Sequence, residues 1–342
     1  MSEAHSAAHG GHDHAAEAVY PYTPHHFHEA KQHFESGKMG VWLFLVTEIL
    51  FFSGLFCAYV AYRAQHPEIF YWAHFYLDTF WGGVNTVVLI LSSFTAAWAV
   101  RNAQLGQVKL LRTNIILTIG GALVFMCVKY VEYGHKFHDG LLPGRHFAPS
   151  HEVWETESFR HKHPEAAEAA KRISARLAER AQKKAASAQI VDTIESTKTP
   201  VAAIPVSHHE GAEPEAVVLP PEDPAMAALP DDVWLETQVR TLSGAERRPL
   251  EMAGVIRKPA DGPITFARPE RAGIFFSIYF FMTGLHGVHV VIGIGLWIWM
   301  LVIASRRKFG ASYFGPIDFT ALYWHLVDLI WIYLFPMLYL IH

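Results

Sequence analysis

Long runs of apolar residues alternate with polar stretches along this chain. A helix needs about 20 mainly apolar residues to cross the ~30 Å hydrocarbon layer of a bilayer, so such runs predict transmembrane helices. Barrel strands are not favoured, because no segment alternates apolar and polar residues over the length that a barrel requires. The sequence therefore predicts an all-α membrane protein with five spanning helices, at residues 41–62, 81–100, 115–133, 273–305 and 319–341.

The polar stretches divide the chain into four expected parts. Residues 1–38 form a His-rich tail, in which imidazole groups suit transition metals, although a solvated tail that binds metal adventitiously is the simpler interpretation. Residues 39–134 hold helices 1–3, and residues 269–342 hold helices 4–5. The long polar insert at 135–268 separates these two groups.

The insert is predicted to be partly helical and partly extended. Its residues 164–191 are rich in Ala, Lys, Arg and Glu, with a thin apolar stripe that includes Ile173 and Leu177. This pattern is typical of an exposed helix docked on a neighbour. Residues 200–232 are rich in proline and acidic residues, which favours an extended linker. Large apolar residues are too sparse in the insert to predict a folded core.

Charge adds an orientation to this picture. The net charge of −4 gives no reason to expect nucleic acid as a partner. Basic residues gather in the short loops at 101–114 and 305–316, so these loops are predicted to be cytoplasmic. Five crossings then place the N-terminus in the cytoplasm, and the C-terminus and the insert outside it. The two cysteines, Cys57 and Cys127, fall in spanning segments and are expected to be buried, inert thiols.

Two carboxyl groups in the first three spanning segments are candidates for function. Glu48 lies in the middle of an apolar segment, where an ionised side chain is costly. It could carry protons, contact a polar lipid group, or serve only as a hydrogen bond between helices. Glu132 ends the third segment in a Val-Glu-Tyr sequence, where local anchoring at the membrane interface is favoured.

The last two segments contain a second polar set. His286 and His289 are three residues apart and share a helix face, as do His325 and Asp328. The first pair could contribute to a metal site, but too few further ligands are present, so contacts between helices, lipids or subunits are favoured. The second pair could be part of a proton relay or a satisfied structural pair, and spacing alone favours the latter.

Four separated motifs together resemble subunit III of the haem–copper oxidases, of the cytochrome c oxidase type. The motifs are Thr47-Glu48-Ile-Leu-Phe-Phe, Val131-Glu132-Tyr133, Thr283-Gly-Leu-His286-Gly-Val-His289 and Tyr323-Trp324-His325-Leu-Val-Asp328. The resemblance covers about residues 37–135 and 270–342, and it includes neither the tail nor most of the insert.

The resemblance implies the five-helix bacterial form of this subunit, in a cytoplasmic membrane. Its helices would form two groups, of three and two, around a V-shaped cleft that holds phospholipid. The chain would carry no metal or other redox centre, because haem and copper belong to the partner subunits I and II. The complex would pass electrons from cytochrome c to oxygen and pump protons.

The resemblance also implies roles for individual residues. Subunit III supports proton uptake and the stability of subunit I, and Glu48 corresponds to a buried carboxylate near a proposed path for protons or oxygen. Glu132 and the residues His286, His289, His325 and Asp328 match signature positions of the family. The insert, on the side where cytochrome c docks, is expected to contact cytochrome c or another respiratory complex.

Three other functions are compatible with the same residues. The chain could be subunit III of a quinol oxidase or an accessory subunit of a nitric oxide reductase. It could also be an independent ion or proton carrier, although carriers of that kind usually show repeated halves with broken helices, and no such repeat is evident.

Overall fold

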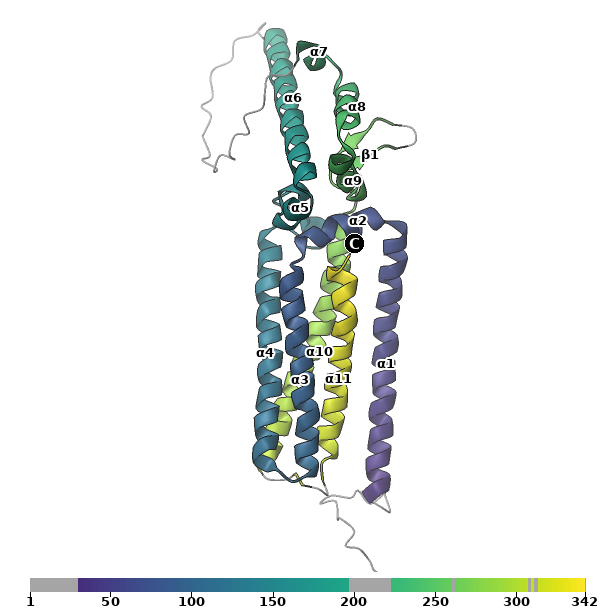
Figure 1. Ribbon diagram of the computed structural model, residues 1–342, viewed down its shortest axis with the longest axis vertical. Helices are drawn as coiled ribbons and strands as arrows, with labels where there is room; N and C mark the ends of the chain where they lie inside the picture. The colour runs from purple at the N-terminus through teal and green to yellow at the C-terminus, as the bar shows by residue number, and fades with distance from the viewer. Residues whose placement is uncertain (1–29, 197–222, 260–261, 307–308, 311–312, 342) are drawn as a thin grey trace, which may run out of the picture. The chain divides into compact units, whose positions relative to one another are not determined.

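Five long helices contain the apolar runs in the computed structural model, which describes residues 30–196, 223–259, 262–306, 309–310 and 313–341 (Figure 1). Each of the five is long and apolar enough to cross a membrane, which confirms the predicted all-α membrane architecture. They are α1 (Ala30–Gln65), α3 (Thr79–Gln104), α4 (Val108–His138), α10 (Gly273–Ser305) and α11 (Gly315–Tyr339).

The helices extend beyond the apolar runs that predict them. α1 begins at Ala30, so the last residues of the predicted polar tail are helical, while the rest of that tail lies outside the described residues. Helix-forming residues such as Lys31 and Gln32 continue the hydrogen-bonded turns past the membrane segment. Between α3 and α4 the chain turns at Gly106, whose φ of 67° is a left-handed conformation that glycine adopts without steric cost.

Contacts divide the chain into two compact units, which are described separately below. The first takes its described residues from Met1–Phe56, Gly83–Tyr130 and Thr283–Phe335. The second takes them from Cys57–Gly82, Val131–Met282 and Pro336–His342.

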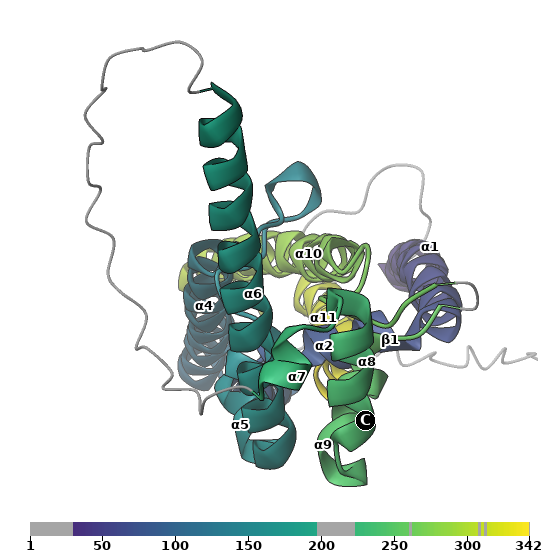
Figure 2. The same ribbon diagram turned by 90° about the horizontal axis from the view of Figure 1, so that it is seen from above.

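The first unit is a helix bundle, whose long helices run lengthwise in Figure 1 and are seen from above in Figure 2. Polar contacts join helices that are distant in the sequence. Trp324 of α11 donates to Ser92 of α3 at 2.8 Å, and Arg112 of α4 donates to the carbonyl of Ala304 in α10 at 3.2 Å. These contacts therefore join helices of the two predicted groups, α3 with α11 and α4 with α10. The lipid-holding cleft between the two groups stays a prediction.

Small residues allow the close approach of helices within this unit. A Cβ atom at Gly293 would lie 2.5 Å from the ring of Trp324, which is too close for any larger residue without movement. At Gly121 the nearest side-chain atom, the Cβ of Ser92, would lie at 2.9 Å. Without a hydrophobic driving force between helices in lipid, such close contacts are a main source of helix association.

The second unit contains the insert, whose described residues form one helix of 33 residues, several shorter helices and a small antiparallel ribbon. In the ribbon Ile256 pairs with Phe266, and Arg257 with Thr265. Besides the ends of the long helices, the second unit contains these elements: α2 (Pro67–Ala73), η1 (His74–Tyr76), η2 (Gly144–His146), η3 (Val153–Glu155), α5 (Glu157–Lys162), α6 (Pro164–Ser196), α7 (Pro224–Ala227), α8 (Asp231–Thr241), α9 (Gly244–Met252), β1 (Ile256–Arg257) and β2 (Thr265–Phe266).

The insert has a buried core, which the sequence analysis did not predict. α6 packs against α8 and α9, as its predicted apolar stripe implies, and Ile173 is buried. Alanines on the same helix offer a flat surface to its neighbours, and Trp234 of α8 and Leu250 of α9 are fully buried. Sequence reasoning missed this core because small alanines, which contribute little hydrophobic area each, supply one of its walls.

Only the end of the acidic, proline-rich stretch, residues 223–232, lies within the described part of the chain. Residues 197–222 lie outside the described part of the chain. From Asp223 onward the chain is helical, because the Asp223 side chain accepts a hydrogen bond from the backbone of Ala225 at 3.0 Å and Pro224 starts α7. An N-terminal cap of this kind with proline at the first helical position starts a helix efficiently. The prediction of an extended linker is therefore wrong for residues 223–232.

The two cysteines are free thiols, as predicted, but they are exposed rather than buried. Cys57 and Cys127 each lie on the outer side of a spanning helix, α1 and α4. An apolar side chain on that side suits lipid as well as a protein interior, so hydropathy alone did not distinguish the two environments.

Candidate functional site

Glu48 and His289 join α1 to α10 in the first unit. The Glu48 Oε2 atom lies 3.1 Å from His289 Nε2, and His289 Nδ1 lies 2.9 Å from the backbone carbonyl of Leu285. A carbonyl can only accept, so Nδ1 carries a hydrogen. Nε2 then faces Glu48 either as an acceptor from a protonated carboxyl or as the donor of an imidazolium. In both cases the pair holds one proton between the two side chains.

The surroundings of this pair restrict its movement. The ring of Phe52 meets the His289 ring edge-on, with centroids 5.3 Å apart. Tyr323 of α11 donates to the backbone carbonyl of His289 at 3.1 Å. The pair is only slightly exposed, at 20% for the Glu48 side chain and 12% for that of His289. The sequence singled out both residues but did not pair them.

His286 has a different environment from His289, although both lie on α10. Its side chain is fully buried against the rings of Phe125 in α4 and Trp331 in α11, at 5.7 and 5.3 Å between centroids. Neither ring nitrogen has a hydrogen-bond partner among the described residues. The two histidines thus contact different helices, and a shared role for them as a pair of ligands is not supported by their contacts.

His325 and Asp328 do not form the pair that their spacing predicts. His325 Nδ1 instead lies 2.6 Å from the hydroxyl of Ser93 in α3. Asp328 is buried, and neither of its carboxyl oxygens has a hydrogen-bond partner of regular geometry among the described residues, although the Ser93 side chain lies close enough to act as a weak donor to it. The prediction failed because a neighbouring helix offered His325 a closer partner than its own helix did.

Glu132 is the centre of a buried cluster in the second unit. Its Oε1 atom accepts hydrogen bonds from Lys136 at 2.7 Å, Tyr279 at 2.8 Å and Tyr339 at 2.5 Å. All four side chains are buried. The cluster joins α4, α10 and α11, so Glu132 does more than anchor its own helix. Of its partners only Lys136, one turn further along α4, could have been found from spacing.

Asn85 is a buried polar residue that the sequence analysis missed. It lies on α3, is fully buried, and has no hydrogen-bond partner for either its oxygen or its nitrogen among the described residues. An amide within an apolar run is a signal of the same kind as Glu48, but it draws less attention because it carries no charge.

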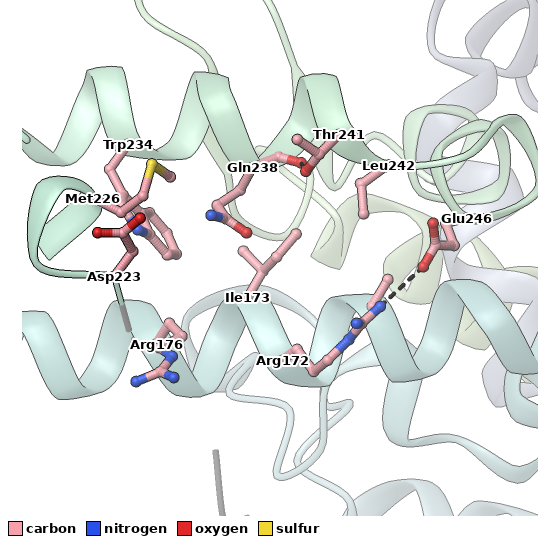
Figure 3. Close-up of a pocket in the computed structure, with 11 residues that line it drawn as sticks. Arg172, Ile173, Arg176, Asp223, Met226, Trp234, Gln238, Thr241, Leu242 and Glu246 are labelled. Carbon is pink, nitrogen blue, oxygen red and sulfur yellow. Dashed lines mark hydrogen bonds and ion pairs between the residues drawn. The ribbon is translucent and has the colours of Figure 1, made fainter. Parts of the chain in front are cut away.

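A cavity of about 450 Å³ lies in the insert, between α6 and the segment from α7 to α9 (Figure 3). Its apolar lining includes Ile173, Met226 and Trp234. Arg172 lines it too, but its guanidinium is paired with Glu246 at 2.9 Å (Figure 3). The charges in its lining therefore balance within the protein, which gives no clear preference for a charged ligand.

Metal ligands do not gather among the described residues. No three side chains of His, Cys, Asp or Glu in the described ranges lie close enough together to hold a metal ion. The residues brought together are those of the Glu48–His289 pair and the Glu132 cluster, and what such arrangements do chemically is hold protons and join helices.

Comparison with known proteins shows that the C-terminal segment is similar to subunits of respiratory membrane complexes. The family model of cytochrome c oxidase subunit III matches residues 266–342. Cytochrome c oxidase subunit 3 of Thermostichus vulcanus is 41% identical over 80 residues, which are 23% of this chain and 39% of that protein. The probable quinol oxidase subunit 3 of Staphylococcus haemolyticus is 35% identical over 69 residues, 20% of this chain and 34% of that protein.

This C-terminal segment is similar to subunit III of the haem–copper oxidases. The matched parts span about two fifths or less of the length of these relatives. The segment contains α10 and α11, with His286, His289, His325 and Asp328. It begins at the end of the insert, so the family match and the insert are nearly separate parts of the chain.

Proposed function

We propose that this chain is a non-catalytic subunit III of a proton-pumping haem–copper terminal oxidase in a bacterial cytoplasmic membrane. The observation that carries the proposal is the family match over α10 and α11, together with Glu48 of α1 in contact with His289 of the matched segment. Electrons from cytochrome c would reach oxygen at haem and copper held by subunits I and II.

In this proposal the chain handles protons and lipid rather than electrons. The Glu48–His289 pair holds one proton between two helices and can take it up or release it, which would support proton uptake by subunit I. The lipid role is supported by α1, whose apolar side chains Leu43 and Leu50 are 70% and 67% exposed. Side chains of that kind favour phospholipid chains or another subunit as neighbours.

A subunit of a quinol oxidase is the second candidate. It is supported by the similarity to the quinol oxidase subunit 3 of Staphylococcus haemolyticus. Mild detergent purification through a tag at the C-terminus, followed by a visible spectrum and mass spectrometry, tests both candidates. Haem a absorbance with a copper-bearing subunit II supports the cytochrome c type. A haem–copper complex that oxidises quinol and lacks that copper supports the second candidate, and nitric oxide reduction would indicate a reductase accessory subunit.

A colourless chain that purifies alone in several mild detergents would overturn the proposal and favour an independent proton carrier. The purification should use membranes rather than overproduced chain alone, because a lone subunit can purify without its complex for reasons of stoichiometry.

The insert is proposed to lie outside the cytoplasm and to contact cytochrome c or another respiratory complex. The proposal is supported by the basic loops, which favour the opposite side, and by the folded core of the insert, which offers a defined surface. Replacing residues 150–249 with a short linker tests it. We expect weaker cytochrome c turnover at low cytochrome c concentration or loss of a co-purifying complex, and unchanged turnover and composition would contradict the proposal.

A further inference from the structure

Three buried polar side chains in the first unit have no hydrogen-bond partner among the described residues. They are Asn85 of α3, His286 of α10 and Asp328 of α11, and their exposed fractions are 0%, 0% and 3%. Both polar atoms of each side chain are unpaired. Buried polar groups in proteins nearly always have a partner, which is another protein group or an ordered water molecule.

Trp331 connects the three side chains in the bundle. Its ring lies 5.3 Å from the ring of His286, and its Nε1 atom donates to Thr86, the residue after Asn85, at 3.0 Å. Asp328 precedes Trp331 by three residues on α11, so both lie on the same side of that helix. Trp331 thus contacts His286 directly, bonds the residue next to Asn85, and shares a helix side with Asp328.

The other titratable groups that face this region have partners of their own. Lys129 of α4 lies over the Trp331 ring, with Nζ 4.5 Å from its centroid. His289 is paired with Glu48, and His325 with Ser93. None of these groups forms a hydrogen bond to Asn85, His286 or Asp328 in the described part of the chain. Ser93, which bonds His325, is a further polar group that interacts with Asp328. For the polar atoms of Asn85 and His286 no protein partner is found in the described part of the chain.

We propose that α3, α10 and α11 enclose a binding site for ordered water, which completes the hydrogen bonds of Asn85, His286 and Asp328. The site offers two donors and one acceptor on Asn85, one donor and one acceptor on neutral His286, and the Asp328 carboxyl. A buried water molecule needs two to four polar partners, and this set provides them for a small cluster. The site lies within helices long enough to span a membrane, where no water is available from lipid.

The bound water would give Asp328 and His286 a route for protons that their direct contacts do not provide. The site is separate from the Glu48–His289 pair, since those two side chains already bond each other. It does not depend on the proposed oxidase function, because it rests on the interior of this chain alone.

Structure determination of the assembled complex in lipid, at a resolution that shows ordered water, tests the proposal. We expect non-protein density within hydrogen-bond distance of at least two of the three side chains. Direct contact between these side chains, or apolar packing around them without such density, would overturn it. Density with the short contacts and higher coordination of a metal cation would overturn it too.

Radiolytic hydroxyl-radical labelling of the full chain in its membrane gives an independent measurement, because radicals form from water and modify side chains beside it. We expect Trp331 to be labelled several-fold faster than Trp324, which is equally buried and bonded to Ser92. Asn85→Leu, similar in size but apolar, should reduce the labelling of Trp331 several-fold. The control Thr118→Val removes a buried hydroxyl that already has partners in Thr95 and Asn114, and it should leave the labelling unchanged.

Equal labelling of Trp331 and Trp324 in the unaltered chain, or an unchanged rate in Asn85→Leu, would contradict the water site. If Asn85→Leu fails to accumulate in the membrane, the comparison of the two tryptophans in the unaltered chain still decides the question. This comparison does not require oxidase activity, so its outcome is distinguishable from failure of the proposed function.

Discussion

Glu132 and Asp328 are both buried carboxyl side chains on helices long enough to span a membrane, yet their surroundings are opposite. One oxygen of Glu132 accepts hydrogen bonds from Lys136, Tyr279 and Tyr339. Neither oxygen of Asp328 has such a partner among the described residues. Burial of a carboxyl group therefore does not define its role. A carboxyl with several protein donors joins helices, whereas one without such donors is available to water and protons.

The comparison predicts that Glu132→Gln has the largest effect on stability. The substitution leaves Lys136 buried without a carboxylate, and breaking a buried ion pair by removing one partner costs about 3–5 kcal/mol. The free energy of unfolding, measured by titration with SDS in mixed micelles, should fall by about that amount. The double variant Glu132→Gln/Lys136→Met removes both charges and should recover most of the loss.

An equal loss in the single and double variants would contradict this account of the Glu132 cluster. It would mean that the contacts of Tyr279 and Tyr339, rather than the ion pair, supply most of the stability. The variants Tyr279→Phe and Tyr339→Phe, each of which removes one hydrogen bond to a carboxylate, would then be expected to cost more than the usual amount of about 1.5–3 kcal/mol.

Glu48 is intermediate between Glu132 and Asp328, because its side chain has one hydrogen-bond partner, His289. Glu48→Ala removes a single hydrogen bond between α1 and α10, so the same measurement should show a loss of about 1 kcal/mol. Glu48→Gln keeps a group that can bond His289 and should cost less. The complex should still assemble with either variant. Failure to assemble would mean that the Glu48–His289 pair chiefly holds α1 in place.

The distance along the sequence between hydrogen-bonded residues explains which features could be predicted from the sequence and which could not. Apolar runs predicted all five helices that could cross a membrane, because that prediction needs only the length and composition of each run. Glu48 and His289 were both identified as polar residues in apolar surroundings, but they are 241 positions apart, and no local pattern reports a contact of that separation. For the same reason the partners Tyr279 and Tyr339 of Glu132 were missed.

The sequence predictions were wrong or incomplete where contacts with another helix determine hydrogen bonding or burial. The spacing of His325 and Asp328 allows a pair on one helix, but Ser93 of another helix bonds His325 instead. In the insert, burial depends on how α6 and α8 fit together, so an alanine-rich helix and one tryptophan, Trp234, form a core that composition does not reveal.

Asp328→Asn is expected to change stability less than either substitution above. No protein hydrogen bond is lost, and asparagine has nearly the same size, so the change in the free energy of unfolding should be below about 1 kcal/mol. In the proposed oxidase complex, the chain should stay bound during detergent purification. A loss as large as that of Glu132→Gln would show that Asp328 has a strong protein partner in the assembled state, and it would remove the contrast between the two residues.

Asp231 provides the comparison with a carboxyl group in contact with solvent, and the smallest expected effect. Its side chain is 49% exposed, and a hydrogen bond from Arg180 at 2.9 Å holds the pKa of Asp231 below its ordinary value of 3.8. A lowered pKa in the folded state means that the stabilisation is present above the ordinary pKa and is lost as the pH falls through the folded value.

Hydrogen exchange of α8 amides in the full chain, corrected for the intrinsic effect of pH, should therefore become slightly faster below about pH 4. Asp231→Asn should remove that part of the pH dependence, whereas Asp232→Asn, at an exposed neighbouring position, should retain it. Added salt should weaken the effect at Asp231, since an exposed pair is screened, and a salt-independent effect as large as that at Glu132 would contradict the distinction between exposed and buried carboxyl groups.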